Sequence, residues 1–125
     1  MHILVTSAGS SLAQCLIPGL AAEHDVRATE RRPVAGVDAL AVSPLGHDLS
    51  TNLLVRGIDV MVHCAEPLAD ESGASYLDYM TRCTYNLLLA AGQEGVKRVV
   101  LLSTLDLLTP YPRDFVVTER WRPLP

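Results

Sequence analysis

A turn of small residues follows the first apolar run of the chain, and its residue types are those of an anion site. The run Ile3–Val5 is followed by Thr-Ser-Ala-Gly-Ser and then by a helical pattern that begins at Ser11. The first turn of a helix offers backbone N–H groups that no carbonyl of the same helix accepts, and such groups bind phosphates. The hydroxyls of Ser7 and Ser10 are further donors. The turn therefore predicts a site for a phosphate group.

An acidic residue ends the second apolar run, 20 residues after Ser10. The run is Val26–Thr29 and the acid is Glu30. In a dinucleotide-binding unit, a carboxylate at this place accepts hydrogen bonds from the adenosine ribose, which favours NAD. Arg31 and Arg32 follow directly, and arginines here bind a 2′-phosphate, which favours NADP. The choice between NAD and NADP is left open, and a solvated acid at a surface edge is the alternative for Glu30 alone.

The elements that must position these residues alternate between strands and helices. Three strong apolar runs are continuous, which is typical of strands that helices cover on both faces, and two weaker runs, Val26–Thr29 and Ala39–Val42, lie between the first two. Residues with apolar spacing of three and four indicate helices. This alternation predicts an α/β fold, a doubly wound, Rossmann-like parallel sheet of about five strands. The predicted strands are Ile3–Val5, Val26–Thr29, Ala39–Val42, Ile58–Val62 and Val99–Leu102, and the predicted helices are Ser11–Ala22, Ser50–Arg56 and Ser72–Glu94.

Single residues are expected to bound or disturb two of these helices. Pro18 lies inside the first pattern and should kink or shorten that helix. For the long third helix, Asp70 or Ser72 is the expected N-cap, and Gly92 or Gly95 is the expected end.

Length and composition limit the class of protein. A chain of 125 residues, 49% hydrophobic and 19% charged, can bury one self-sufficient core, so we expect one domain without extensive disorder. The formal net charge is −4 and no basic stretch could follow a phosphate backbone, so nucleic acid is not an expected partner. The apolar runs are far shorter than the roughly 20 residues of a membrane span. The start M-H-I-L-V lacks a charged leader, and we expect a cytoplasmic protein.

The cysteines and histidines do not have the spacing of a metal site. Cys15, Cys64 and Cys83 form neither a ligand set nor a redox pair, and their odd number indicates buried free thiols in a reducing compartment. His63 lies inside an apolar run, where a hydrogen-bonded core role is more frequent than catalysis. We therefore predict no metal.

The end of the chain has a different character. Residues 106–125 contain four prolines and no sustained periodicity, which indicates an extended surface segment. We expect a Rossmann-like domain over residues 1–105 and a Pro-rich tail over 106–125 that leads to a C-terminal part.

The turn after the first run resembles the glycine motif of the extended short-chain dehydrogenase/reductases, also called NAD-dependent epimerase/dehydratases. That family has T-G-x-x-G-x-x-G where this chain has T-S-A-G-S-S-L-A. The three glycines fall on Ser7, Ser10 and Ala13, and Gly9 stands at a variable position. The three glycines allow a tight turn, a close approach of the backbone to the pyrophosphate, and close packing of the helix on the strand. With serines in the first two places, Ser7 would hold a strained turn conformation and Ser10 would place a hydroxyl at the pyrophosphate.

Further segments resemble the family in the same order along the chain. Gly46-His-Asp-Leu49 is similar to its G-D-L turn, and Gly57–Ala65 is similar to G-x-D-x-V-x-H-x-A. Thr84–Thr104 is similar to T-x-N-L-L-x-A-A-x-x-x-G-V-x-R-x-V with its S-S ending. The resemblance extends from Ile3 to about Thr104.

This resemblance implies an NAD- or NADP-dependent oxidoreductase that acts on a nucleotide sugar or similar hydroxyl-bearing small molecule. A homodimer is left open. The resemblance places the pyrophosphate and its turn at Ser7, Gly9, Ser10, Ser11 and Leu12, the ribose at Glu30 and Arg31, the adenine at Asp48 and Leu49, and the nicotinamide half at Cys64 and Ala65.

The catalytic set that the resemblance implies is incomplete. Thr104 takes the position of the family's catalytic hydroxyl, with Ser103 beside it. The family's Tyr-x-x-x-Lys dyad is absent, because the only lysine is Lys97 and no tyrosine stands four residues before it. Two accounts follow: the N-terminal half of a longer enzyme, or a non-catalytic nucleotide-binding module such as a pseudoenzyme, sensor or scaffold. A flavodoxin-like FMN carrier is a third alternative, although the chain is only 5% aromatic.

Overall fold

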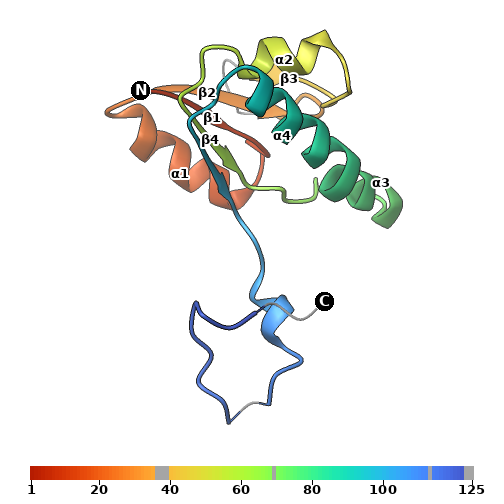
Figure 1. The fold of residues 1–125 in the computed structure, drawn as a ribbon. Coiled ribbons are helices and arrows are strands. Elements are labelled where there is room, and N and C mark those ends of the chain that lie inside the picture. The colour runs from red at the N-terminus through yellow and green to blue at the C-terminus, as the bar shows by residue number, and fades with distance from the viewer. Residues whose placement is uncertain (36–39, 69, 113, 123–125) are drawn as a thin grey trace.

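The centre of the molecule is a five-stranded parallel sheet with strand order β3-β2-β1-β4-β5 (Figure 1). The computed structural model describes residues 1–35, 40–68, 70–112 and 114–122. The strand order reverses between β1 and β4, which creates a topological switch point at the carboxyl edge of the sheet. The predicted Rossmann-like fold is confirmed. The strands are β1 (His2–Val5), β2 (Asp25–Glu30), β3 (Ala41–Val42), β4 (Val60–His63) and β5 (Arg98–Leu101).

Helices cover both faces of the central strands (Figure 1). Ile3 and Val5 of β1 belong to the core cluster on the side of α1 (Ser11–Ala21). Leu4 between them packs into the opposite cluster, with α2 (Leu49–Val55) and α4 (Thr84–Gln93). This alternation along β1 is what a strand buried on two faces requires.

The long predicted helix exists but is built from three parts. It consists of α3 (Gly73–Asp78), the π-helical turn η1 (Tyr79–Cys83) and α4. Ser72 is the N-cap, since its hydroxyl accepts from Ser75 N at 3.2 Å, and Gly95 follows the helix with a φ of +77°. The sequence pattern did not predict the π turn, in which the Thr84 hydroxyl donates to the Tyr79 carbonyl at 2.9 Å.

Three expectations about single elements need correction. The helix α1 continues past Pro18 to Ala21, so the proline does not shorten it. Pro18 lies on the exposed side of α1, where water can take the place of the missing N–H donor. Cys15 is exposed on the same helix, whereas Cys64 and Cys83 are buried as predicted. The strand β3 begins at Ala41, and the predicted start Ala39 lies outside the described residues.

The strand β5 is exposed along its whole length, contrary to the expectation of helices on both faces. Val99 and Val100 are about 40% exposed and Leu101 is 55% exposed. The reason is that no side chain of β5 belongs to either core cluster of the described residues, although β5 pairs with β4 at the edge of the sheet. Three apolar side chains therefore remain at the surface there.

The tail forms a small unit of its own beyond β5 (Figure 1). It begins with the short 3-10 helix η2 (Leu105–Leu108), which crosses the predicted boundary at residue 105. The Trp121 ring then lies edge-on to Tyr111, with centroids 4.7 Å apart, and 5.7 Å from Phe115. The tail is thus not simply extended, because an aromatic cluster folds it back on itself. None of the helices in the described part of the chain has the length and hydropathy of a membrane span.

Candidate functional site

The turn between β1 and α1 lies at the switch point. Its backbone has the conformation that the family's glycine motif implies. Ser7 has a φ of +51°, in the left-handed region that favours glycine. The turn is fixed by two backbone hydrogen bonds, Ser10 N to Ser7 O at 2.8 Å and Ala8 N to Thr29 O at 3.1 Å. The strained conformation expected at Ser7 is therefore present, with a serine where the family has glycine.

Ser10 caps α1 and leaves donors at the start of that helix. Its hydroxyl oxygen accepts from Ala13 N at 3.2 Å, and its side chain is partly exposed. The cap uses the oxygen of this hydroxyl as an acceptor, so the proton can still be donated. The N–H groups of Ser11 and Leu12 open the first turn, where a helix supplies no internal acceptor. Both residues are exposed, so these groups can reach an anion.

Glu30 ends β2 and faces the turn instead of solvent. Its carboxylate accepts from Gly9 N at 3.3 Å and from Arg31 N at 2.9 Å, and the residue is only 2% exposed. A Cβ on Gly9 would lie 3.0 Å from the Val34 side chain, which explains a glycine at this position. The alternative of a solvated acid is therefore wrong, since Glu30 is built into the wall of the predicted site.

Arg31 is held by two residues that the sequence pattern did not single out. Its guanidinium forms a two-pronged ion pair with Glu71, in which Nη2 of Arg31 lies 2.7 Å from Oε2 of Glu71. The same guanidinium lies 3.6 Å above the centre of the Tyr79 ring. The hydrogen bonds from Arg31 lower the pKa of Glu71 to about 2. The sequence could have indicated the Arg31–Glu71 pair only through the topology of the sheet. The carboxyl ends of β2 and β4 lead into loops at the same edge, where the two residues meet.

The hydroxyl of Ser7 joins the turn after β1 to the loop after β4. The Ser7 hydroxyl lies 2.8 Å from the Tyr79 hydroxyl and accepts from Glu66 N at 3.2 Å. Tyr79 is 1% exposed, and burial raises its pKa. The side chain of Ser7 is therefore directed to the loop and to helix η1.

His63 has the core role that the sequence favoured. Thr84 donates to the Tyr79 carbonyl, so the His63 Nε2–H donates to Thr84 at 2.8 Å and Nδ1 accepts from the Thr6 hydroxyl at 2.8 Å. Thr6 in turn accepts from Cys64 N at 3.2 Å. Burial lowers the pKa of His63 to about 4, which keeps the ring neutral. The histidine joins β4 to the turn after β1 and to α4, and it is fully buried.

Five of the predicted site residues line one cavity of about 440 Å³ at the carboxyl edge. Glu66, Tyr76 and Met80 are also in its wall. The Thr104 hydroxyl is used locally, since it accepts from Asp106 N at 3.1 Å and lies 2.9 Å from an Asp106 carboxylate oxygen. The structure thus brings together the four residues expected at the nicotinamide and substrate end, which are Cys64, Ala65, Ser103 and Thr104, with Leu12, which was expected at the pyrophosphate turn.

A second cavity of about 490 Å³ lies on the side of β2 and β3. Arg31, Glu71 and Ser72 are in its wall, together with the ion pair of Asp78 and Arg82. It is the more highly charged of the two cavities and adjoins the predicted ribose side.

The structure does not bring Asp48 and Leu49 into either of these two cavities. Asp48 is the N-cap of α2, where its carboxylate accepts from Ser50 N at 2.9 Å. The hydrogen bond from the Ser50 hydroxyl is the main cause that lowers the pKa of Asp48. Leu49 is 68% exposed. Their adenine role stays a prediction.

The single lysine cannot act at this site. Lys97 Nζ lies 2.6 Å from Asp59, which precedes β4, and Lys97 itself precedes β5. Both residues are therefore at the amino edge of the sheet, opposite the turn after β1.

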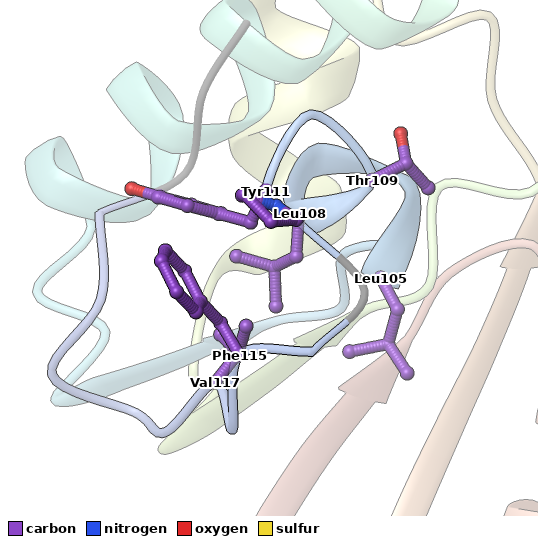
Figure 2. Close-up of a pocket in the computed structure, with 7 residues that line it drawn as sticks. Leu105, Leu108, Thr109, Tyr111, Phe115 and Val117 are labelled. Carbon is purple, nitrogen blue, oxygen red and sulfur yellow. The ribbon is translucent and has the colours of Figure 1, made fainter.

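A third cavity of about 310 Å³ belongs to the tail, and Figure 2 shows the residues around it. It shares no residue with the two cavities of the carboxyl edge. Its apolar neighbours are well exposed, with Leu105 at 81% and Val116 at 83%. The lining residues are Leu105, Leu108, Thr109, Tyr111, Pro112, Phe115 and Val117.

Several solved structures share the fold over the whole chain. A mutated uronate dehydrogenase is 25% identical with a TM-score of 0.81, over 99% of this chain and 46% of its own. MoeE5 in complex with UDP-glucose and NAD is 26% identical with a TM-score of 0.77, over 100% and 43%. UDP-N-acetylglucosamine 4-epimerase from Bacillus cereus is 20% identical with a TM-score of 0.79, over 100% and 44%, which supports the fold alone.

These structures are longer than the chain, which spans less than half the length of each of the three. No protein-family model matches the sequence, and no curated protein matches it. The relationship is therefore carried by the structure together with the motifs in register. The resemblance to the extended short-chain dehydrogenase/reductases is confirmed in the fold: the chain is similar to less than half of each of these proteins, and its turn after β1 departs from the family's glycine motif.

Proposed function

We propose that this chain binds NAD or NADP at the carboxyl edge of its sheet, as the cofactor domain of an epimerase/dehydratase-type oxidoreductase. The observation that carries the proposal is the Glu30 carboxylate, buried and hydrogen-bonded to Gly9 N in the turn after β1. A small-residue turn with a carboxylate from the next strand beside it is the arrangement that holds a dinucleotide. MoeE5, which is 26% identical to this chain, is solved in complex with NAD, and this supports the same ligand class.

Each proposed contact has a chemical basis in this chain. The Ser10 hydroxyl and the N–H groups of Ser11 and Leu12 hold the pyrophosphate, because they are the available donors at the start of α1. Glu30 accepts from the ribose hydroxyls with the lone pairs that Gly9 and Arg31 leave free. Asp48 and Leu49 are assigned to the adenine.

The cavity of about 440 Å³ at the other end of the edge is assigned to the nicotinamide and substrate. Cys64 and Ala65 line it on the nicotinamide side, and Thr104, with Ser103 beside it, orients a substrate hydroxyl. When bound, the dinucleotide supplies a hydride acceptor or donor at the nicotinamide ring. The expected substrate is a nucleotide sugar or a similar hydroxyl-bearing small molecule, and MoeE5 is crystallised with UDP-glucose.

The reaction itself is proposed for a whole protein and not for these 125 residues. No tyrosine in the sequence is followed four residues later by a lysine. We propose residues 1–105 as the dinucleotide-binding domain and 106–125 as the segment that leads to a C-terminal part with the missing acid and base. A non-catalytic module that keeps the dinucleotide is the second candidate, and the missing dyad is the observation in its favour.

Titration calorimetry of the chain with NAD, NADP and FMN tests the proposal. Wild type is expected to bind a nicotinamide dinucleotide. Glu30→Gln is expected to lose about tenfold or more in affinity, because an amide group replaces an acceptor that two N–H groups and the ribose require. Glu23→Gln is the matched control, since Glu23 is exposed near the end of α1. Binding of FMN alone would contradict the proposal.

A further inference from the structure

Arg31 is the first of the two arginines through which this chain would accept a 2′-phosphate. It follows Glu30 directly, and an arginine at this place distinguishes NADP from NAD because a guanidinium binds phosphate with two parallel hydrogen bonds. The sequence alone leaves its role open. The structure shows what this guanidinium contacts.

Both terminal nitrogens of the Arg31 guanidinium and one of its faces are in contact with other side chains. Both terminal nitrogens donate to the two Glu71 oxygens, and one ring face of Tyr79 lies against the guanidinium plane at 3.6 Å. Nε, which is buried, lies 3.9 Å from the Glu30 carboxylate and is the single buried side-chain nitrogen or oxygen without a hydrogen bond in the described part of the chain. A phosphate could gain the two-pronged contact only by displacing Glu71.

Glu71 is itself fixed in this position. Its side chain is 4% exposed, and it accepts from Leu68 N at 3.0 Å and from the Ser75 hydroxyl at 2.7 Å. These contacts come from the loop after β4 and from α3, so the carboxylate does not depend on Arg31 alone for its place. A 2′-phosphate near Arg31 would also meet the negative charges of Glu71 and Glu30.

We propose that Glu71 sets a preference for NAD over NADP, by holding the Arg31 guanidinium so that it cannot bind a 2′-phosphate. The inference rests on the proposed function. It assigns Glu71 as a positioning residue that acts through Arg31, and it explains how an arginine can follow the ribose-binding acid in a site for NAD.

The test compares NAD and NADP affinities by titration calorimetry at one fixed salt concentration, since phosphate contacts depend on salt. The wild-type chain is expected to bind NAD at least about tenfold more tightly than NADP. In Glu71→Gln the affinity ratio is expected to shift toward NADP by about tenfold or more, the factor that one charge-assisted hydrogen bond supplies. The double variant Glu71→Gln/Arg31→Gln should lose this gain, because the released guanidinium is gone.

Asp78→Asn is the matched control, because Asp78 pairs with Arg82 in the wall of the same cavity. It removes one carboxylate charge there without releasing Arg31, and the affinity ratio is expected to stay close to that of wild type. Circular dichroism and thermal unfolding of each variant confirm that it is folded. The wild-type ratio needs no variant, so it tests the inference even if Glu71→Gln does not fold.

Several results would overturn the inference alone. These are a wild type that prefers NADP, a Glu71→Gln variant in which both affinities change by the same factor, a double variant that keeps the gain, or an Asp78→Asn variant that shows the same shift. A wild type that binds neither dinucleotide would contradict the proposed function itself, and the inference would fall with it.

Discussion

The hydroxyl of Ser7 lies 2.8 Å from the hydroxyl of Tyr79, at a position where the backbone of Ser7 has a φ of +51°. A non-glycine residue in this region costs about 1–3 kcal/mol and persists only where the surrounding structure holds it there. Here the serine hydroxyl joins the turn after β1 to the buried tyrosine of η1 and to Glu66 N. Where the family has a glycine, this chain therefore has a side chain that connects two loops at the same edge of the sheet.

This relationship predicts an energetic coupling between Ser7 and Tyr79. Ser7→Gly should relieve backbone strain but remove the hydroxyl that lies 2.8 Å from the buried Tyr79 hydroxyl, which costs about 1–3 kcal/mol. In a Tyr79→Phe background this hydrogen bond is already absent, so Ser7→Gly should be less destabilising by about 1 kcal/mol. Urea unfolding of the two single variants and the double variant measures this coupling. Additive free energies would show that the two hydroxyls do not interact.

His63 should make the stability of the fold depend on pH in the weakly acidic range. Its pKa is about 4 in the folded chain against an ordinary value of 6.5, so the unfolded chain binds the proton more readily. The stabilisation is therefore complete above pH 6.5 and decreases as the pH falls from 6.5 toward 4. Between about pH 7.5 and pH 5 the loss is about 2 kcal/mol.

Urea unfolding at these two pH values, in wild type and in His63→Gln, measures the contribution of His63. The variant is expected to be less stable at neutral pH but to show a smaller loss on acidification. The carboxylates with a pKa near 2, Asp59 and Glu71, change little in this range. An equal loss in both proteins would show that His63 is not the group that titrates.

Ser10 should contribute both to the stability of α1 and to ligand binding. Ser10→Ala removes the N-cap, which costs about 1 kcal/mol, and also removes a donor to the pyrophosphate. Ser10→Thr keeps an oxygen and a proton in the same place and is expected to restore most of both effects. Urea unfolding gives the first quantity and NAD titration the second. If Ser10→Ala bound NAD as tightly as wild type, the hydroxyl would have no part in the site.

The tail should lose its structure before the sheet does. Trp121 is the only tryptophan and lies in the aromatic cluster with Tyr111 and Phe115, so its fluorescence reports on the tail. The cluster is small, and the apolar residues around it, such as Val116 at 83%, are largely exposed. We expect the fluorescence transition in urea at a lower concentration than the transition in far-UV circular dichroism. Coincident transitions would show that tail and sheet unfold as one unit.

The sequence predicted the sheet well because its strands carry continuous apolar runs that few other elements have. Leu4, for example, is fully buried between two β1 neighbours that face the opposite helix layer. The exposure of β5 could not be read in the same way, since Val99 and Leu101 have the composition of a covered strand. The apolar pattern of a segment shows which side chains it can bury. It does not show whether another element packs against them.

The candidate site was predicted in part. The motif in the turn after β1 and the acid at Glu30 depend on local order along the chain, and the structure brings both together. The Arg31–Glu71 pair joins residues 40 positions apart, and no periodicity connects them. Asp48 matches a family motif and also caps α2, so its adenine role stays a prediction.

The most direct test of the account is a titration of the isotope-labelled chain with NAD, followed by backbone amide NMR shifts. We expect the largest amide shift changes at Gly9, Ser10 and Ser11 in the turn after β1, with further shift changes at Ala65. The amide shift of Phe115 in the tail is expected to stay unchanged. Saturable changes confined to the tail, or none at millimolar NAD, would contradict the claim that this edge of the sheet binds the cofactor.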